Sequence, residues 1–104
     1  MPKAYVIAHV KLKNSEMFMA EYASKVGGTV ESFGGKFLVR GGEVSYQDGE
    51  PLGEDINVII EFPDRAAALS WQNSSEYQEI LPARQAYANV HFMIVDGLPG
   101  MGGD

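Results

Sequence analysis

Residues able to bind an anion or move a proton recur in four segments of this chain that have the composition of β-strands. Because strand side chains alternate between two faces, each segment distributes its residues over the two faces of a sheet. One face is entirely apolar, whereas the other mixes apolar residues with a few polar ones, the usual lining of a small-molecule pocket. The segments are residues 4–12, 36–40, 56–62 and 89–95, and the polar residues predicted on the second face are Tyr5, His9, Arg40, Asn57, Glu61 and His91.

Arg40 and Glu61 are two charged residues on this second face, and they belong to neighbouring strands of the predicted sheet. A guanidinium can hold a substrate carboxylate or enolate with two parallel hydrogen bonds. A carboxyl group in an apolar cavity has a raised pKa and can take a proton from a substrate. The two residues can equally form a buried ion pair, because buried charges are costly unless they are paired. Both interpretations stay open, and the hairpin register leaves Arg40 opposite either Asn57 or Glu61.

The two histidines are expected close together, because His9 lies late in the first strand and His91 early in the last. Such a pair can supply a general base with a partner, or half of a metal site. It can also be two half-buried side chains whose nitrogens bond to backbone or water. A protein metal site normally has three or four ligands, so no metal site is predicted here.

Further candidates surround the second predicted helix. Trp71 is expected in the core and Ser74 at the start of a helical turn. Tyr77 and Arg84 either pack there or reach the mouth of a cavity. The predicted catalytic residues are Arg40, Glu61 and His9, and the predicted substrate-binding residues are Tyr5, Asn57, Trp71, Tyr77, Arg84 and His91.

The elements between the strands follow from turn and capping signals. Asn14 or Ser15 can cap a first helix that runs to about Lys25, where the glycines at 27 and 28 interrupt it and leave a short turn over residues 29–33. Asp64 can cap a second helix over residues 65–73. A capping box at residues 75–78 predicts one more turn, Pro82 breaks or restarts that helix, and residues 84–88 lead into the last strand.

Two glycine-rich stretches are expected to be irregular. The glycines at 41 and 42 can bulge or bend the second strand, which could continue through residues 43–46, and residues 47–54 have the composition of a hairpin loop. The last residues, 98–104, are rich in glycine and predict a flexible tail after a single domain at residues 1–97.

The order β-α-β-β-α-β predicts an α+β fold, with a four-stranded antiparallel sheet in the order 4-1-3-2 and both helices on one face. The uncovered face would then expose more apolar surface than a monomer usually shows. We therefore predict a homodimer in which two sheets stack face to face and enclose the polar residues in a cavity.

Composition excludes several classes of partner. The net charge of −6 argues against binding nucleic acid or an anionic membrane surface, both of which require clustered cations. The absence of cysteine excludes disulfides and thiolate chemistry. No apolar run reaches the roughly 18 residues that a membrane span needs, and no signal peptide is recognisable, so a soluble cytoplasmic protein is expected.

Three motifs carry a family resemblance. They are Gly-Gly-Lys-Phe-Leu-Val-Arg-Gly-Gly at residues 34–42, Ile-Glu-Phe-Pro at residues 60–63, and Trp71-x-x-Ser74-x-Glu76-Tyr77-Gln78 with Arg84 downstream. Together they resemble the small proteins grouped as domain of unknown function 1330, over about residues 4–97. The resemblance implies a ferredoxin-like fold of the dimeric α+β barrel superfamily, which includes cofactor-free monooxygenases, muconolactone isomerases and haem-binding members.

Three functional hypotheses follow. In the first, the dimer cavity binds a small organic acid or aromatic metabolite, or binds it and transforms it by proton transfer or cofactor-free oxygenation, with no cofactor. In the second, the protein is a non-catalytic ligand-binding or structural dimer module whose polar groups hold the dimer together. In the third, His9 and His91 bind a metal or haem.

Overall fold

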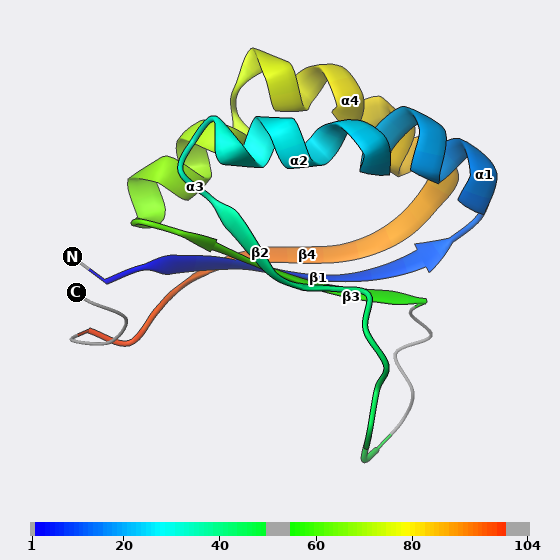
Figure 1. Cartoon of the computed structure of the whole chain (residues 1–104), viewed down its shortest axis with the longest axis horizontal. Coiled ribbons are helices and arrows are strands. Elements are labelled where there is room, and N and C mark those ends of the chain that lie inside the picture. Colours follow the sequence, from blue (N-terminus) through cyan, green and yellow to red (C-terminus); the bar gives the residue numbers. More distant parts are fainter. Residues whose placement is uncertain (1, 50–54, 100–104) are drawn as a thin grey trace.

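A computed structural model of the chain describes residues 2–49 and 55–99. Within these residues, four strands form one antiparallel sheet in the order β2-β3-β1-β4, and the helices cover a single face of it (Figure 1). The predicted order 4-1-3-2 is the same order counted from the other edge, so the α+β prediction is confirmed. The strands are β1 (Ala4–Leu12), β2 (Lys36–Arg40), β3 (Ile56–Phe62) and β4 (Ala88–Asp96).

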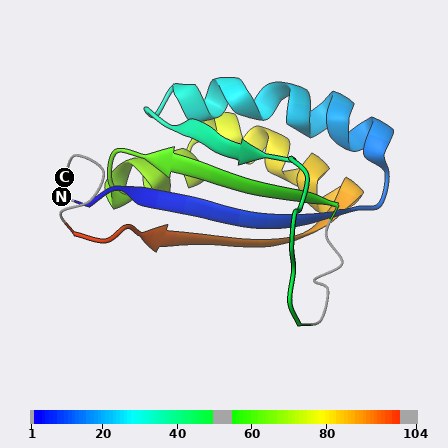
Figure 2. The same ribbon diagram turned by 60° about the horizontal axis from the view of Figure 1, so that its bottom comes forward.

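The long central strand β1 pairs with β3 on one side and β4 on the other (Figure 2). The predicted bounds of β1, β2 and β3 are confirmed, and β4 is one residue longer at each end than predicted. In this register His9 lies directly opposite His91 on β4 and opposite Asn57 on β3. The predicted proximity of the two histidines is therefore confirmed.

A bulge in β2 changes the face on which Arg40 lies. Phe37 pairs with Ile60, but the register shifts before Val39, which pairs with Ile59, and Arg40 then pairs with Val58. Strict alternation would have put Arg40 on the face away from the helices and Val39 on the helix side; the extra residue exchanges them. The predicted placement of Arg40 beside Glu61 on the outer face is thus wrong.

The first helical segment is longer than predicted. It comprises α1 (Ser15–Phe18), a π-helical stretch η1 (Met19–Ala23) and α2 (Ser24–Glu31), which follow one another without a break. The Asn14 side chain accepts a hydrogen bond from the Met17 N–H, which confirms the predicted cap. The predicted interruption at Gly27 and Gly28 is wrong, because Val26 and Val30 are buried on either side of them and their packing holds the helix together.

The second helical region also continues past its predicted end. Asp64 caps α3 (Arg65–Gln72), as predicted, and Ser74 caps α4 (Ser75–Tyr87) by accepting from the Tyr77 N–H. Pro82 lies inside α4 and does not break it. Proline removes one helical hydrogen bond, but the burial of Tyr77 and Ile80 on the same helix favours its continuation.

Strand β2 ends at Arg40 because Gly41 and Gly42 both have positive φ angles, 86° and 76°, which turn the chain out of the sheet. The predicted continuation over residues 43–46 is not a strand; this segment projects away from the helices (Figure 1). Residues 50–54 of the predicted hairpin loop and 100–104 of the predicted tail lie outside the described residues. No helix in the described ranges is long and apolar enough to cross a membrane.

The core lies between the sheet and the helices. Its largest fully buried side chains are Trp71, Tyr77, Phe62, Val6 and Val30, so the predicted burial of Trp71 is confirmed. The opposite face of the sheet has no covering layer within the described residues (Figure 1). Large apolar side chains exposed on this outer face and its edge are Leu38, Val39, Met93 and Val95.

Candidate functional site

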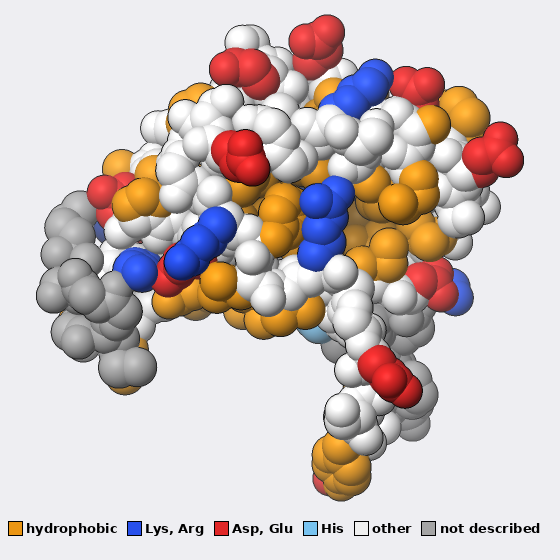
Figure 3. All heavy atoms as spheres, viewed as in Figure 1, with side chains coloured by type: hydrophobic (Ala, Val, Ile, Leu, Met, Phe, Trp, Pro, Cys, Tyr) orange, Lys and Arg blue, Asp and Glu red, His pale blue; other side chains and the backbone are white. Residues whose placement is uncertain are grey.

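A mostly apolar hollow lies inside the single chain, between the sheet and the helices. Its volume is about 340 Å³, which is within the usual range of small-molecule pockets. Figure 3 shows its apolar lining beneath the helical layer. Strands β1, β3 and β4 supply the floor through residues such as Val6, Val58 and Phe92, and the π-helical stretch supplies much of the roof through Met19, Tyr22 and Ala23.

Trp71 and the buried tyrosines hold one wall of this cavity rigid. The Trp71 ring lies 4.3 Å from the Tyr77 ring, centre to centre, and 5.4 Å from that of Phe62. Its indole N–H donates to the Thr29 hydroxyl at 3.0 Å. Since Trp71 has its polar group satisfied and lines the cavity, it presents an apolar aromatic surface to any ligand there.

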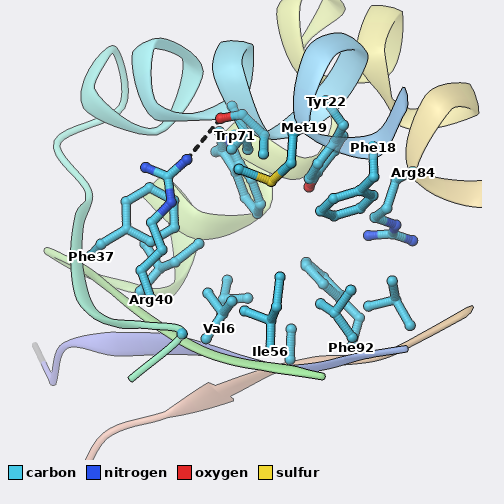
Figure 4. Close-up of a pocket in the computed structure, with 18 residues that line it drawn as sticks. Val6, Phe18, Met19, Tyr22, Phe37, Arg40, Ile56, Trp71, Arg84 and Phe92 are labelled. Atoms are coloured by element: carbon cyan, nitrogen blue, oxygen red, sulfur yellow. Dashed lines mark hydrogen bonds between the residues drawn. The ribbon is translucent and has the colours of Figure 1, made fainter. Parts of the chain in front are cut away.

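Arg84, on α4, brings a positive charge to the cavity (Figure 4). Its Nη1 donates to the Tyr77 hydroxyl at 2.9 Å, and its guanidinium carbon lies 4.9 Å from the centre of the Phe92 ring. Its Nε is buried and has no hydrogen-bond partner, and no carboxylate of the described residues pairs with it. The protein therefore uses only part of the hydrogen-bonding capacity of this guanidinium.

The Tyr22 and Tyr77 hydroxyls lie 2.8 Å apart. Burial raises the pKa of both, and the neighbouring Tyr77 raises that of Tyr22 further. Both tyrosines are consequently neutral at physiological pH. Because Arg84 can only donate, the Tyr77 oxygen accepts its N–H, and either hydroxyl can be the donor between Tyr77 and Tyr22.

Arg40 is the other charged residue that lines the cavity, and it lies at its exposed side. Its Nη2 donates to the Ala23 carbonyl at 2.7 Å, drawn as a dashed line in Figure 4, and its guanidinium carbon lies 4.6 Å from the centre of the Phe37 ring. No carboxylate of the described residues pairs with Arg40. The cavity thus contains two cations and, within the described part of the chain, no anion.

Glu61 does not line this cavity. Its carboxylate lies 3.1 Å from Lys3 Nζ and 3.5 Å from Lys36 Nζ, and the Tyr5 hydroxyl donates to it at 3.4 Å. The hydrogen bond from Lys3, together with the charges of both lysines, holds its pKa below the usual range despite some burial. The predictions that an apolar cavity raises this pKa and that Arg40 pairs with Glu61 are therefore wrong.

The histidines also lie on the outer face. His9 Nδ1 lies 2.8 Å from Asn57 Oδ1, close enough for a hydrogen bond in which the amide oxygen accepts. No group of three or more His, Asp or Glu among residues 2–49 and 55–99 is placed to hold a metal ion. Of the predicted site residues, the structure places Arg40, Trp71 and Arg84 on the cavity, Tyr77 behind it, and Tyr5, His9, Asn57, Glu61 and His91 on the outer face.

Sequence reasoning missed the cavity itself and its roof. Phe18, Met19 and Tyr22 recur at helical spacing, which is typical of a core helix, so their pattern gives no sign that they face a hollow. The π-helical stretch that carries Met19 and Tyr22 is a type of irregularity often found at functional sites, but it has no sequence signature here.

Comparisons with known proteins identify the fold and leave the activity open. The family model for domain of unknown function DUF1330 matches residues 3–98. A protein of unknown function from Rhodopseudomonas palustris superposes with a TM-score of 0.76 at 22% identity, over 93% of this chain and 83% of its own. SnoaB, a cofactor-independent oxygenase from Streptomyces nogalater, superposes with a TM-score of 0.64 at 11% identity, over 97% and 98%.

An antibiotic biosynthesis monooxygenase superposes with a TM-score of 0.56 at 18% identity, over 92% of this chain and 99% of its own. No curated protein matches the sequence. At these identities the solved structures establish a shared ferredoxin-like α+β fold.

Proposed function

The chain belongs to the DUF1330 family, and we propose that its function is to bind a small organic anion with an aromatic or otherwise apolar body in the cavity between sheet and helices. The observation that carries this proposal is Arg84, a guanidinium on an apolar cavity with a buried Nε that has no acceptor. An unpaired buried donor is costly, and a hydrogen bond to a charged group stabilises by about 1.5–3 kcal/mol. A bound carboxylate would pair with the guanidinium, and a small rotation of the side chain would give Nε its missing acceptor.

The rest of the cavity suits the body of such a ligand. Trp71 and Phe92 offer aromatic faces, and Tyr22 can donate a hydrogen bond. Since apolar surface provides affinity and a few polar groups fix orientation, this composition favours an aromatic acid over a sugar or a phosphate ester.

Proton transfer inside the cavity receives no support. Within the described residues, neither a carboxylate nor a histidine lines it, and Tyr22 in its lining and Tyr77 behind it both have raised pKa values. Glu61 and His9 remain candidates only for chemistry on the outer face of the sheet. Binding is therefore the primary proposal.

The binding proposal is tested with phenylacetate and its neutral analogue phenylacetamide. Trp71 is the one tryptophan of the chain and lines the cavity, so its fluorescence reports occupancy, with calorimetry as a second readout. We expect phenylacetate to bind at least tenfold tighter, and we expect Arg84→Gln to abolish this preference. The matched control is Arg65→Gln, because Arg65 is an exposed arginine that pairs with Asp96 away from the cavity.

Equal affinity for the acid and the amide, or a preference that survives Arg84→Gln, would refute the proposal. Arg84→Lys keeps a charge at this position and should retain part of the preference. Circular dichroism of each variant separates lost binding from lost folding.

Cofactor-free oxygenation is a second candidate, favoured by the pairing of cations with an apolar hollow. A guanidinium stabilises the ionised form of a phenol or enol, which is the electron-rich form that can react directly with O₂. The fold is also that of SnoaB, a cofactor-independent oxygenase. Oxygen uptake with ionisable polyphenols, measured with and without Arg84→Gln, tests this; uptake no faster than the buffer blank would exclude it for those substrates.

We also propose that two copies associate through the outer face. Met93 is 54% exposed there, among the other apolar side chains named above. In native mass spectrometry the 11.3 kDa chain should appear at twice its mass, and Met93→Asp should give the monomer. Leu69→Asp is the control, because Leu69 is 44% exposed on the helical side and should leave the dimer intact. A wild-type monomer, or a dimer that persists in Met93→Asp, would contradict the proposal.

A further inference from the structure

The two arginines of the cavity lie at opposite ends of a single cross-strand row. Arg40 on β2 pairs with Val58 on β3, Val58 pairs with Ala8 on β1, and Ala8 pairs with Phe92 on β4. Arg84 lies over the ring of Phe92 at the far end of this row. Because β2 and β4 are the two edges of the sheet, the row spans three strand spacings, or about 14 Å of backbone.

The floor between the two arginines is apolar and open. Val58 and Ala8 both line the cavity, and Ala8 has the smallest side chain that a floor position can have apart from glycine. Figure 4 shows Arg40 and Arg84 on opposite sides of the hollow. A ligand lying across this floor can therefore approach both guanidinium groups at once.

Each guanidinium is held in place without being neutralised. Arg40 is fixed by the Ala23 carbonyl and the Phe37 ring, and Arg84 by the Tyr77 hydroxyl and the Phe92 ring. All four supports are uncharged groups. In a chain of net charge −6, two cations that line one cavity and have no carboxylate partner among the described residues form a local positive site.

From this geometry we propose that the ligand carries two anionic groups, one at each end of an aromatic body, with Arg84 binding one and Arg40 the other. This inference rests on the proposed function and narrows it to aromatic diacids, or to hydroxy acids bound with the hydroxyl ionised. A monoanion would leave Arg40 without a partner. Arg40 is then a specificity-determining residue at the exposed end, and Arg84 is the anchor at the inner end.

The test compares diacids with their own monoamides. The probes are 1,4-phenylenediacetate and the longer 2,6-naphthalenediacetate, each against the compound in which one carboxylate is an amide. A diacid gains a statistical factor of two, and a partly exposed ion pair contributes up to about 1 kcal/mol, so we expect roughly fivefold to tenfold tighter binding. The gain in affinity of the diacid over its monoamide should decrease with added salt, which screens the partly exposed ion pair.

In Arg40→Gln the gain should fall to the statistical factor of two, and the affinity for phenylacetate should fall by a smaller factor than the affinity for the diacid. That second readout separates ligand recognition from a purely structural role, in which both affinities would fall by the same factor. Arg40→Lys should restore part of the gain. Lys36→Gln is the control, because Lys36 is a cation of the same strand that pairs with Glu61 outside the cavity.

Two outcomes overturn the inference. One is that neither diacid binds more than twofold tighter than its monoamide, and the other is that the gain in affinity persists in Arg40→Gln. Either result would mean that Arg40 does not bind a second anionic group. The proposed function survives either result as long as phenylacetate is still preferred over phenylacetamide through Arg84. Loss of that preference as well would refute both.

Discussion

The hydrogen-bonded chain formed by Arg84, Tyr77 and Tyr22 predicts an asymmetry between two otherwise similar substitutions. Tyr77 lies in the middle, 2.9 Å from Arg84 Nη1 and 2.8 Å from the Tyr22 hydroxyl, whereas Tyr22 lies at one end. Removing the Tyr22 hydroxyl breaks one bond, and removing the Tyr77 hydroxyl breaks two. Tyr77→Phe should therefore destabilise the protein more than Tyr22→Phe.

The expected magnitudes follow from the groups left behind. Tyr22→Phe loses one bond between neutral groups, worth about 1 kcal/mol, and Tyr77 keeps its bond from Arg84. Tyr77→Phe loses that bond and also a bond from a charged donor, worth about 1.5–3 kcal/mol, so its total cost is roughly 3 kcal/mol. It leaves Arg84 with Nη1 unpaired in addition to the already unpaired Nε.

Urea unfolding at pH 7, followed by Trp71 fluorescence and circular dichroism at one protein concentration, measures both variants. The difference of about 2 kcal/mol corresponds to roughly 8–16 °C in melting temperature for a domain of this size. In the double variant, Tyr22→Phe should add no further destabilisation, because Tyr77→Phe has already removed the hydrogen bond between the two hydroxyls. The expected coupling energy between the two substitutions is therefore about 1 kcal/mol. Equal costs for the two single variants, or strict additivity in the double variant, would refute this arrangement.

Other predictions concern local structure. Gly35→Ala should destabilise the protein by about 1–3 kcal/mol, because the added carbon would lie 2.6 Å from the Phe62 ring. Gly28→Ala should stabilise it by about 0.5–1 kcal/mol, because Gly28 lies in a helix and the added carbon would have no atom within 4 Å. Thermal melts of the two variants check both signs. Ser74→Ala removes the cap of α4 and should cost about 1 kcal/mol in urea. The pKa of Glu61 is lower in the folded state than its ordinary value of 4.5. Its contribution to the free energy of unfolding is therefore complete above pH 4.5 and is lost as the pH falls through the pKa of the folded state. The stability difference between wild type and Glu61→Gln should accordingly shrink below about pH 4.5, and a difference independent of pH would contradict the lysine pairing.

The strands were predictable because their side-chain period of two extends over several residues in each segment. The limits of β1, β2 and β3 follow from this alternation together with the glycines and Pro63 around them. The helices were predicted with the right positions but ended too early. At Gly28 and at Pro82 the local preference is against a helix, and burial of neighbouring apolar side chains outweighs a cost of about 1–3 kcal/mol.

The site was harder to predict than the fold. Trp71 and Arg84 could be selected as candidates from their position in the chain, yet the cavity that they line inside the single chain was not predicted. The decisive feature is the bulge between Phe37 and Val39, which leaves the composition of β2 unchanged. A bulge of one residue cannot be read from a five-residue strand, since either alternation fits the same sequence.

That bulge has a functional consequence, because it places Arg40 and Glu61 on opposite faces of the sheet. With regular alternation, Arg40 would lie opposite Asn57 on the outer face, away from the cavity. With the bulge, Glu61 pairs with Lys3 and Lys36 outside, while Arg40 reaches the cavity without a carboxylate partner among the described residues. On the outer face, Glu61 is neutralised by the two lysines. In the cavity, the positive charge of the arginines remains available to bind an anion. The proposed anion specificity of the cavity therefore depends on backbone geometry as much as on residue type, and restoring regular alternation in β2 would remove it without changing any residue of the cavity floor.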